Sequence, residues 1–205
     1  MIAAVSTLGD KLQAGLEQLT EAEILYRRGR PPKARYFFKH ALVQDAAYNS
    51  LLKRNRQRHH RNIAELIEQK FSSLAESNPE IPGRHHDEAG NVIRAIRCYQ
   101  KVGEKFLLTS ANEEAIAQFG KALELNTRLS TGRDIENQEL SILLMLTPAL
   151  VAARGYAATE VESAYQRALE LGKTLGDTDK QCTVVLGLAM IYQLKAEMPR
   201  AKQLS

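Results

Sequence analysis

The stretch that decides the fold is Asn112–Asn126, NEEAIAQFGKALELN. Ala115 and Ala122 lie on either side of Phe119 at helical spacing, so two small side chains and one aromatic ring share a helix face. Small residues let a neighbouring helix approach closely, and the ring fills the space between the two helices. The stretch therefore predicts a helix packed against an antiparallel neighbour.

The segment before this helix carries a second set of markers. Tyr99, Val102, Gly103 and Phe106 fall where a tetratricopeptide repeat places an aromatic residue, a leucine, a glycine and a tyrosine. With the three markers above, every position of the repeat agrees in kind except the last, where Thr127 replaces a proline. We therefore predict a tetratricopeptide-like helical hairpin. The residues predicted to pack within it are Tyr99, Gly103, Phe106, Ala115, Phe119 and Ala122.

Weaker copies of the pattern follow. They are marked by Val161, Tyr165 and Ala168, and then by Leu188, Ala189, Tyr192 and Ala201. Because Ala201 would belong to a second helix, the chain would stop at Ser205 inside that helix. A solenoid needs a polar cap over its apolar end. We therefore expect the repeats to be truncated at the C-terminus, as in a fragment or a shortened copy of a longer protein.

Local signals mark several helix ends. Ser110-x-x-Glu113 and Thr159-x-x-Glu162 match the capping box, which predicts helices beginning after Ser110 and Thr159. Gly155 and Gly176 stand where the ends of helices require a left-handed residue. Pro148 lies inside an otherwise good helix and predicts a kink or a break there.

The first part of the chain combines a helix with the strand signals of the sequence. We predict a helix over Lys11–Ala22, followed by β-formers at Ile24–Tyr26 and Tyr36–Phe38. The Gly29–Pro32 turn between them cannot be helical. A helix followed by a hairpin with a basic tip is the outline of the last helix and the wing of a winged helix. Two linking helices are predicted from Ala41 onward.

The clearest break in the pattern is Ser77–Gly83, which contains two prolines and a glycine. We take it as a domain boundary. Residues 1–76 are predicted to form a partial winged helix and a linking helix pair, and residues 84–205 to form the tetratricopeptide-like repeats. The predicted fold is therefore mostly α, with one β-hairpin followed by an α-solenoid.

Composition is that of an ordinary globular protein, with 44% hydrophobic and 25% charged residues among 205. The net charge of +4 is uneven: residues 27–61 hold eleven Lys and Arg against one acid, Asp45, so that segment carries +10 and the remainder −6. Two cysteines are too few for a disulfide framework. The sequence shows no good signal peptide, and its longest apolar run, Ile142–Ala153, is too short for a membrane span. We expect a cytoplasmic protein without membrane contact.

The basic hairpin is the first candidate site. Its candidate nucleic-acid contacts are Arg27, Arg28, Arg30, Lys33 and Arg35. A DNA-binding winged helix also needs a groove-reading helix, and here that helix would end in LEQLTEAE, which is acidic and lacks a good base reader. We therefore favour an architectural role for the hairpin and keep DNA binding as the alternative.

The second candidate site is the surface of the repeats. The first helix of each pair lines a groove in such solenoids, and its side chains bind peptides or partner domains. In the best repeat these positions are Arg97, Gln100 and Glu104. A partner protein and intramolecular packing on other domains of a parent protein remain equal alternatives.

Metal and thiol chemistry are not favoured. Adjacent histidines on a helix point about 100° apart, so His59-His60 and His85-His86 are poor zinc ligands, and His60 is expected to be a packed core residue. Cys98 lacks a C-x-x-C partner and is expected to be an unreactive thiol. We predict no metal and no cofactor.

Several stretches together resemble one bacterial family. They are ILYRRGRPPKARYFFKHALVQDAAYNSLL, RQRHHRNIAELIE, HHDEAG, SANEEAIAQFGKALEL and GYAATEVESAYQRALELGKTLGD. The resemblance is to the C-terminal region of large signalling proteins that join a class III adenylate/guanylate cyclase domain, an AAA-like STAND ATPase domain, a winged helix and tetratricopeptide repeats. This chain has no G-x-x-x-x-G-K-[ST] loop and no counterpart of the cyclase aspartates. No catalytic residue carries over, and we predict that the chain is not an enzyme.

The chain departs from this family at PEIPGRHHDEAG, where a helix resembling PELLAHHYTEAG is expected. Pro82 and Gly83 would cost about 3 and 1 kcal/mol inside a helix, so we expect that helix to be shortened.

The resemblance implies a non-catalytic interaction and regulatory segment that couples an ATPase domain to partner sensing. Its expected partner is a protein or the other domains of a parent. The alternatives are a DNA-binding regulator and a member of the cyclase family by descent that lacks the catalytic domain.

Overall fold

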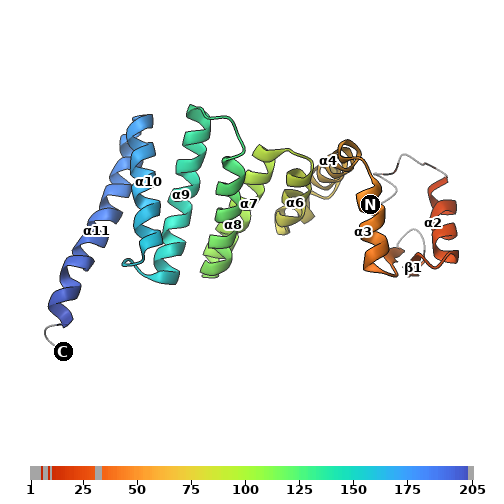
Figure 1. The fold of residues 1–205 in the computed structure, drawn as a ribbon, viewed down its shortest axis with the longest axis horizontal. Helices are drawn as coiled ribbons and strands as arrows, with labels where there is room; N and C mark the ends of the chain where they lie inside the picture. The colour runs from red at the N-terminus through yellow and green to blue at the C-terminus, as the bar shows by residue number, and fades with distance from the viewer. Residues whose placement is uncertain (1–5, 7–8, 10, 31–33, 203–205) are drawn as a thin grey trace.

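The computed structural model describes residues 6, 9, 11–30 and 34–202, with side chains described as far as Leu194. Within these residues the fold is mostly α-helical, with ten helices and one two-stranded antiparallel sheet. The elements are α2 (Lys11–Glu21), β1 (Leu25–Arg28), β2 (Arg35–Phe38), α3 (Ala41–Ser50), α4 (Lys53–Lys70), α5 (Ser72–Ser77), α6 (Glu80–Glu88), α7 (Val92–Leu108), α8 (Asn112–Asn126), α9 (Arg133–Arg154), α10 (Thr159–Leu175) and α11 (Thr178–Lys202). They form an elongated row with the hairpin near one end and α11 at the other (Figure 1). The prediction of a mostly α protein with a small hairpin and a helical solenoid is confirmed.

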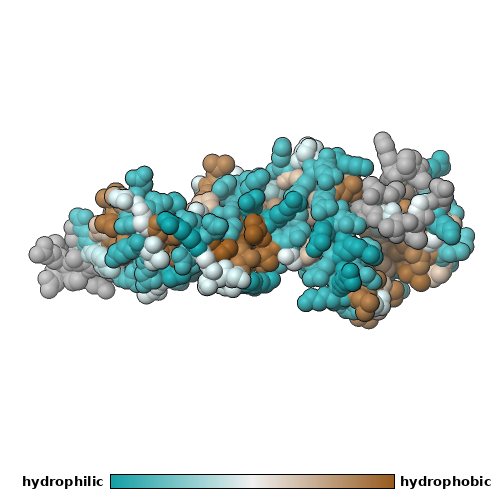
Figure 2. All heavy atoms as spheres, turned by 90° about the horizontal axis from the view of Figure 1, so that it is seen from above, coloured by the Kyte–Doolittle hydropathy of each residue, from teal (hydrophilic) through white to brown (hydrophobic). Residues whose placement is uncertain are grey.

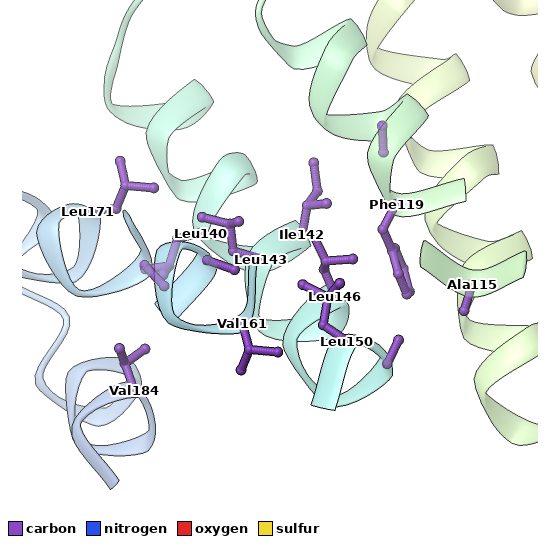
Figure 3. Packing of buried hydrophobic residues seen from close by; sticks show 14 of the residues in the cluster. Ala115, Phe119, Leu140, Ile142, Leu143, Leu146, Leu150, Val161, Leu171 and Val184 are labelled. Carbon is purple, nitrogen blue, oxygen red and sulfur yellow. The ribbon is translucent and has the colours of Figure 1, made fainter. Parts of the chain in front are cut away.

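The core of the molecule lies between consecutive antiparallel helices from α7 to α11. α9 is packed between α8 and α10, and its apolar residues Leu140, Leu143 and Leu146 point into the interior (Figure 3). Phe119 from α8 and Val161 from α10 are fully buried on either side of it. Each inner helix of this stack therefore packs against the helix before it and the helix after it, as in a solenoid.

Glycine and aromatic residues make the closest helix contacts. A Cβ atom on Gly103 would lie 2.6 Å from Cε1 and Cζ of Phe119, so the Phe119 ring of α8 occupies the space beside the backbone of α7. Gly187 of α11 stands in the same relation to the Tyr165 ring of α10. Small residues thus admit a ring between two backbones at both places.

The sequence signals predicted the C-terminal ends of the helices correctly but not their N-terminal ends. Gly155 and Gly176 follow α9 and α10 with φ of +78° and +71°, as predicted. The capping boxes were wrong. α8 and α10 begin after Ala111 and Ala158, and neither has a side-chain hydrogen bond at its cap. Tertiary packing stabilises these helix starts without the expected hydroxyl, because most helical stability in a protein comes from the buried face.

The prediction of a final helix pair was also wrong. α11 runs without interruption from Thr178 to Lys202, so Ala201 lies on the same helix as Leu188. Ala189 and half of Tyr192 are exposed, and Gly187 is the small residue that receives the neighbouring ring. The weak repeat pattern assigned the glycine position to Ala189, two residues after Gly187, which occupies it in the structure.

Two prolines lie inside helices where we expected a break. Pro148 is exposed and α9 continues through it. Pro82 belongs to the first turn of α6, where a missing N–H is tolerated. Gly83 in the same helix is also buried, and a Cβ atom there would lie 2.9 Å from Cβ of Cys98. The Ser77–Gly83 segment therefore contains the end of α5, a two-residue connection and the first turn of α6. The division into residues 1–76 and 84–205 stays a prediction.

The elements before α4 are built differently. β1 and β2 pair with Leu25 opposite Phe38 and Arg28 opposite Arg35, and α2 packs beside β1. α2 and α3 contain no buried residue, and Leu25 is the one buried side chain among the described residues up to Leu52. We call Lys11–Leu52 the N-terminal module. None of the helices described in the chain is long and apolar enough to cross a membrane.

Candidate functional site

The hairpin presents its arginines to solvent. Arg27 and Arg28 lie on β1, Arg30 follows that strand, and all are exposed. Arg35 opens β2 with its Cα opposite that of Arg28, and like charges at opposed positions destabilise a strand pair. None of these four arginines forms an ion pair within the described part of the chain, and Lys33 lies outside it. The structure thus places four of the five predicted cations exposed on the hairpin, with Arg28 and Arg35 opposite each other and Arg27 on the other face of the ribbon.

The helix beside this hairpin is acidic. Glu17 and Glu21 are exposed on α2, and Glu23 follows α2 with an Oε2 that accepts a hydrogen bond of 2.7 Å from Lys39 Nζ. A duplex that reached the arginines through α2 would meet these carboxylates first. The geometry therefore agrees with the electrostatic argument against groove reading.

The predicted partner-binding residues of α7 share a stripe. Arg97 and Glu104 are exposed and Gln100 is half-buried, with the three, four and seven residue spacings of one helix face. They do not line either of the two cavities described below. The structure brings them together on a surface but does not place them in a pocket.

The larger of these cavities has a volume of about 870 Å³ and lies between α8, α9 and α10. We call it the α8–α10 pocket. Its walls are mainly apolar. α9 contributes Leu143, Leu146 and Leu150, which lie on two successive turns of that helix and are labelled in Figure 3. Volumes of this size hold small organic ligands in other proteins. No sequence motif indicated this pocket.

Polar groups in the α8–α10 pocket are few and unequally satisfied. Asn126 is 4% exposed; its Nδ2 donates to the Ile135 carbonyl at 3.3 Å, and its Oδ1 has no hydrogen-bond partner among the described residues. Arg167 is held by both oxygens of Glu139, with Nε–Oε1 of 2.7 Å and Nη2–Oε2 of 3.0 Å. The pocket therefore has one orphaned acceptor and a cation that is already neutralised.

The second cavity, about 820 Å³, lies where the N-terminal module meets α4 and α6. His60 Nδ1 is 2.8 Å from His85 Nδ1, and His60 Nε2 is 2.9 Å from the hydroxyl of Tyr48 on α3. That hydroxyl makes a long contact of 3.5 Å to Glu88 Oε2. Two ring nitrogens at 2.8 Å need one hydrogen between them, so one imidazole donates and the other accepts.

This pairing disfavours a second proton. Burial lowers the pKa of both His60 and His85 below the ordinary value. For His60, Arg84 and His59 lower the pKa further, while the Glu88 carboxylate opposes them. For His85, His60, Arg84 and His86 add to the effect of burial, and Glu88 again opposes it. We therefore expect protonation of this histidine pair to weaken the contact between α4 and α6.

The histidines do not pair as neighbours in sequence. His60 was expected in the apolar core, but it is half-buried in the hydrogen-bonded chain just described. His86 is fully buried and its Nε2 lies 2.8 Å from Oε1 of Glu68. Across the described residues, no three His, Cys, Asp or Glu side chains are placed to hold a metal ion.

Cys98 lies partly buried on α7 beside Gly83. Burial, with a smaller effect of the Glu68 carboxylate, raises the pKa of its thiol to about 11. The thiolate needed for nucleophilic chemistry is therefore scarce at neutral pH.

Sequence reasoning missed both cavities because their shape depends on the distance and angle between neighbouring helices, which the periodicity of one helix does not fix. A signal was present for one of them. Asn126 is the last residue of the Asn112–Asn126 stretch. An amide at the buried end of a helix needs hydrogen-bond partners, so this residue could have indicated a polar group inside the stack.

Comparison with known proteins gives little. No model of a known protein family matches the chain, and no solved structure matches it. The chain is 27% identical over 157 residues to an uncharacterized protein of Rhizobium meliloti (strain 1021). That alignment covers 77% of this chain but 15% of the relative, so the chain spans a small part of the length of the curated relative it matches.

Proposed function

We propose that this chain is a non-catalytic protein-interaction and regulatory segment of a bacterial cyclase- or ATPase-type signalling protein. The N-terminal module contacts a partner domain, and the solenoid is the scaffold that carries the module.

The observation that carries this proposal is the open apolar surface of the N-terminal module. Its members are Leu19, Tyr26, Phe37, Phe38, Leu42, Val43, Tyr48, Leu51 and Leu52, all exposed. Leu42 and Leu52 are 82% and 73% exposed, and Figure 2 shows apolar side chains gathered at this end of the molecule. Covering one large apolar side chain contributes about 1.5–3 kcal/mol. Several large apolar side chains exposed on so small a module favour a contact with another protein.

Charge indicates the kind of partner. The arginines of the hairpin lie next to the apolar surface and lack carboxylate partners in the described chain. Complementary potentials steer association and set its register. We infer a partner domain with an apolar patch bordered by Asp and Glu.

Membership in a larger protein has separate support. The matched segment is 15% of the Rhizobium meliloti relative, and the family that the chain resembles places this region after an ATPase domain. The module, with one helix on each side of a two-stranded sheet, is too small to bury its own apolar residues, since isolated hairpins are marginally stable.

DNA binding is the second candidate, because the opposed Arg28 and Arg35 form a surface that phosphates would also stabilise. Phe37 and Phe38, exposed on the same hairpin, favour a protein over a phosphate backbone.

The test is photo-crosslinking in the bacterium that encodes the chain. A benzophenone amino acid at Leu52 should give a protein adduct whose crosslinked peptides come from an acidic partner surface. The matched control is Leu108, which is 87% exposed on α7 and should give no such adduct. Leu42→Asp should abolish the Leu52 adduct.

Two results would count against the proposal. A nuclease-sensitive adduct with steep salt dependence would establish the DNA-binding candidate, and equal or absent adducts at Leu52 and Leu108 would remove the protein interface. Nucleotide turnover by the purified chain would contradict the non-catalytic assignment.

A further inference from the structure

The α8–α10 pocket has the features of a ligand site, and it is independent of the N-terminal module. Its volume of about 870 Å³ is a hollow partly open to solvent, whose inner wall is formed by apolar side chains of three helices that belong to the core of the stack. Stacked helices of a solenoid normally leave few voids larger than a water molecule. The hollow lies beside this packed core and is open to solvent, so a ligand can enter it without unfolding the stack.

The charged lining indicates the sign of that occupant. The lining contains three carboxylates, from Glu136, Glu139 and Glu160, and one cation, Arg167. Arg167 is neutralised by Glu139, and Glu160 is paired with Arg154 at 3.0 Å. Glu136 has no ion pair within the described residues. The pocket thus offers a free carboxylate and no free cation.

The buried amide points to the same chemistry. The Asn126 orientation is set by its Nδ2–H bond to the Ile135 carbonyl, because a flipped amide would place two acceptors against each other. Its Oδ1 is left buried and without a donor. A buried acceptor without a partner is destabilising by more than a typical hydrogen bond contributes. Asn126 also lies beside the Ile135–Glu136 segment that supplies the free carboxylate.

We propose that the α8–α10 pocket binds a small organic cation, with an apolar body against the leucines of α9 and a protonated amine directed to Glu136, where a small turn of the Asn126 side chain brings its Oδ1 within reach. An amine supplies N–H donors and positive charge together, which is what these two acceptors lack. Binding at this site would join α8, α9 and α10 and would stabilise the middle of the solenoid by mass action.

The probe for this proposal is 2-phenylethylammonium, compared with 3-phenylpropionate and 2-phenylethanol. In titration calorimetry on the full chain, the ammonium compound should bind and the carboxylate should not, with the alcohol weaker by about tenfold, as expected when a charge-assisted contact is lost. Equal binding of the three, or no binding of the ammonium compound, would overturn the assignment.

Two variants localise the site. Glu136→Gln should weaken binding about tenfold, whereas Glu114→Gln, which removes an exposed carboxylate of α8 outside the pocket, should leave it unchanged. Asn126→Leu should abolish binding with little change in the melting temperature, because it removes the orphaned acceptor together with the long 3.3 Å bond to the Ile135 carbonyl. A lower melting temperature with unchanged probe binding would show that Asn126 serves the fold alone and would refute the site.

Discussion

The N-terminal module and the solenoid show two outcomes of similar local signals. α2, α3, α8 and α10 are all formed by helix-favouring stretches of sequence. In the solenoid Phe119 and Val161 are fully buried, whereas α2 and α3 have no buried residue. Local propensity specifies a helix in either place, but cooperative stability requires layers that cover each other's apolar faces. The apolar residues of the module are left uncovered, whereas the inner faces of α7 to α10 are covered by neighbouring helices.

The largest difference is expected when a ring is removed from each region. Phe119→Ala should lower the free energy of unfolding by about 3–5 kcal/mol, because it empties the space between α7 and α8. Phe37→Ala is the matched change in the module, where the ring is 39% exposed, and it should lower that energy by less than about 1 kcal/mol. Urea unfolding followed by circular dichroism measures both. Equal losses would mean that the Phe37 ring is packed as fully as the Phe119 ring.

A smaller effect is expected from adding a single methyl group. Gly103→Ala should destabilise the solenoid by about 1–3 kcal/mol, since the new Cβ would overlap the Phe119 ring. Gly120→Ala, in an exposed position of α8 with no atom within 4 Å of the added Cβ, should instead stabilise by up to about 1 kcal/mol. Thermal unfolding of the two variants checks the signs. If Gly103→Ala were also stabilising, helix propensity would outweigh the contact with the Phe119 ring.

The junction between the regions is expected to respond to pH. The folded pKa values of His60 and His85 are lowered from 6.5 by burial first and by neighbouring cations second. A lowered folded pKa means that the unfolded chain binds protons more readily, so the contribution is fully present above pH 6.5 and is lost as pH falls through the folded pKa values. The melting temperature should therefore fall between pH 7.5 and pH 5.

Variants separate this contact from other titrating groups. His85→Gln should flatten the fall in melting temperature, while His40→Gln, an exposed histidine before α3, should leave the slope unchanged. Hydrogen exchange should show faster opening of α3 at acid pH, since Tyr48 is bonded to His60. An unaltered slope in His85→Gln would contradict the assignment.

The smallest effect is expected at the open apolar surface. Leu52→Lys should change the free energy of unfolding of the isolated chain by no more than about 0.5 kcal/mol, because this side chain contacts solvent. Leu140→Lys, the same change at a fully buried position of α9, should prevent stable folding because it buries an unpaired charge. Chemical unfolding of both variants compares them directly. A large loss at Leu52 would show that the module already has a core.

Sequence reasoning located the solenoid because the contact between Gly103 and Phe119 depends on residue types with distinct volumes. It was wrong about α11 because weak repeats leave the register of small residues open, and Gly187 was overlooked beside Ala189. It was wrong about Pro82 and Gly83 for another reason. The cost of these residues in a helix depends on their position and on packing against Cys98, which local propensity does not include.

The sequence by itself determined the helical class, the hairpin, the uneven charge and the pairing of small and aromatic residues, because each of these depends on neighbours within one or two helical turns. Tertiary structure alone decided that His60 meets His85, that Asn126 is left without a donor and that the helices before α4 remain uncovered. Those features arise where residues far apart in the chain come together. Periodicity within a helix carries no information about the distance between two helices.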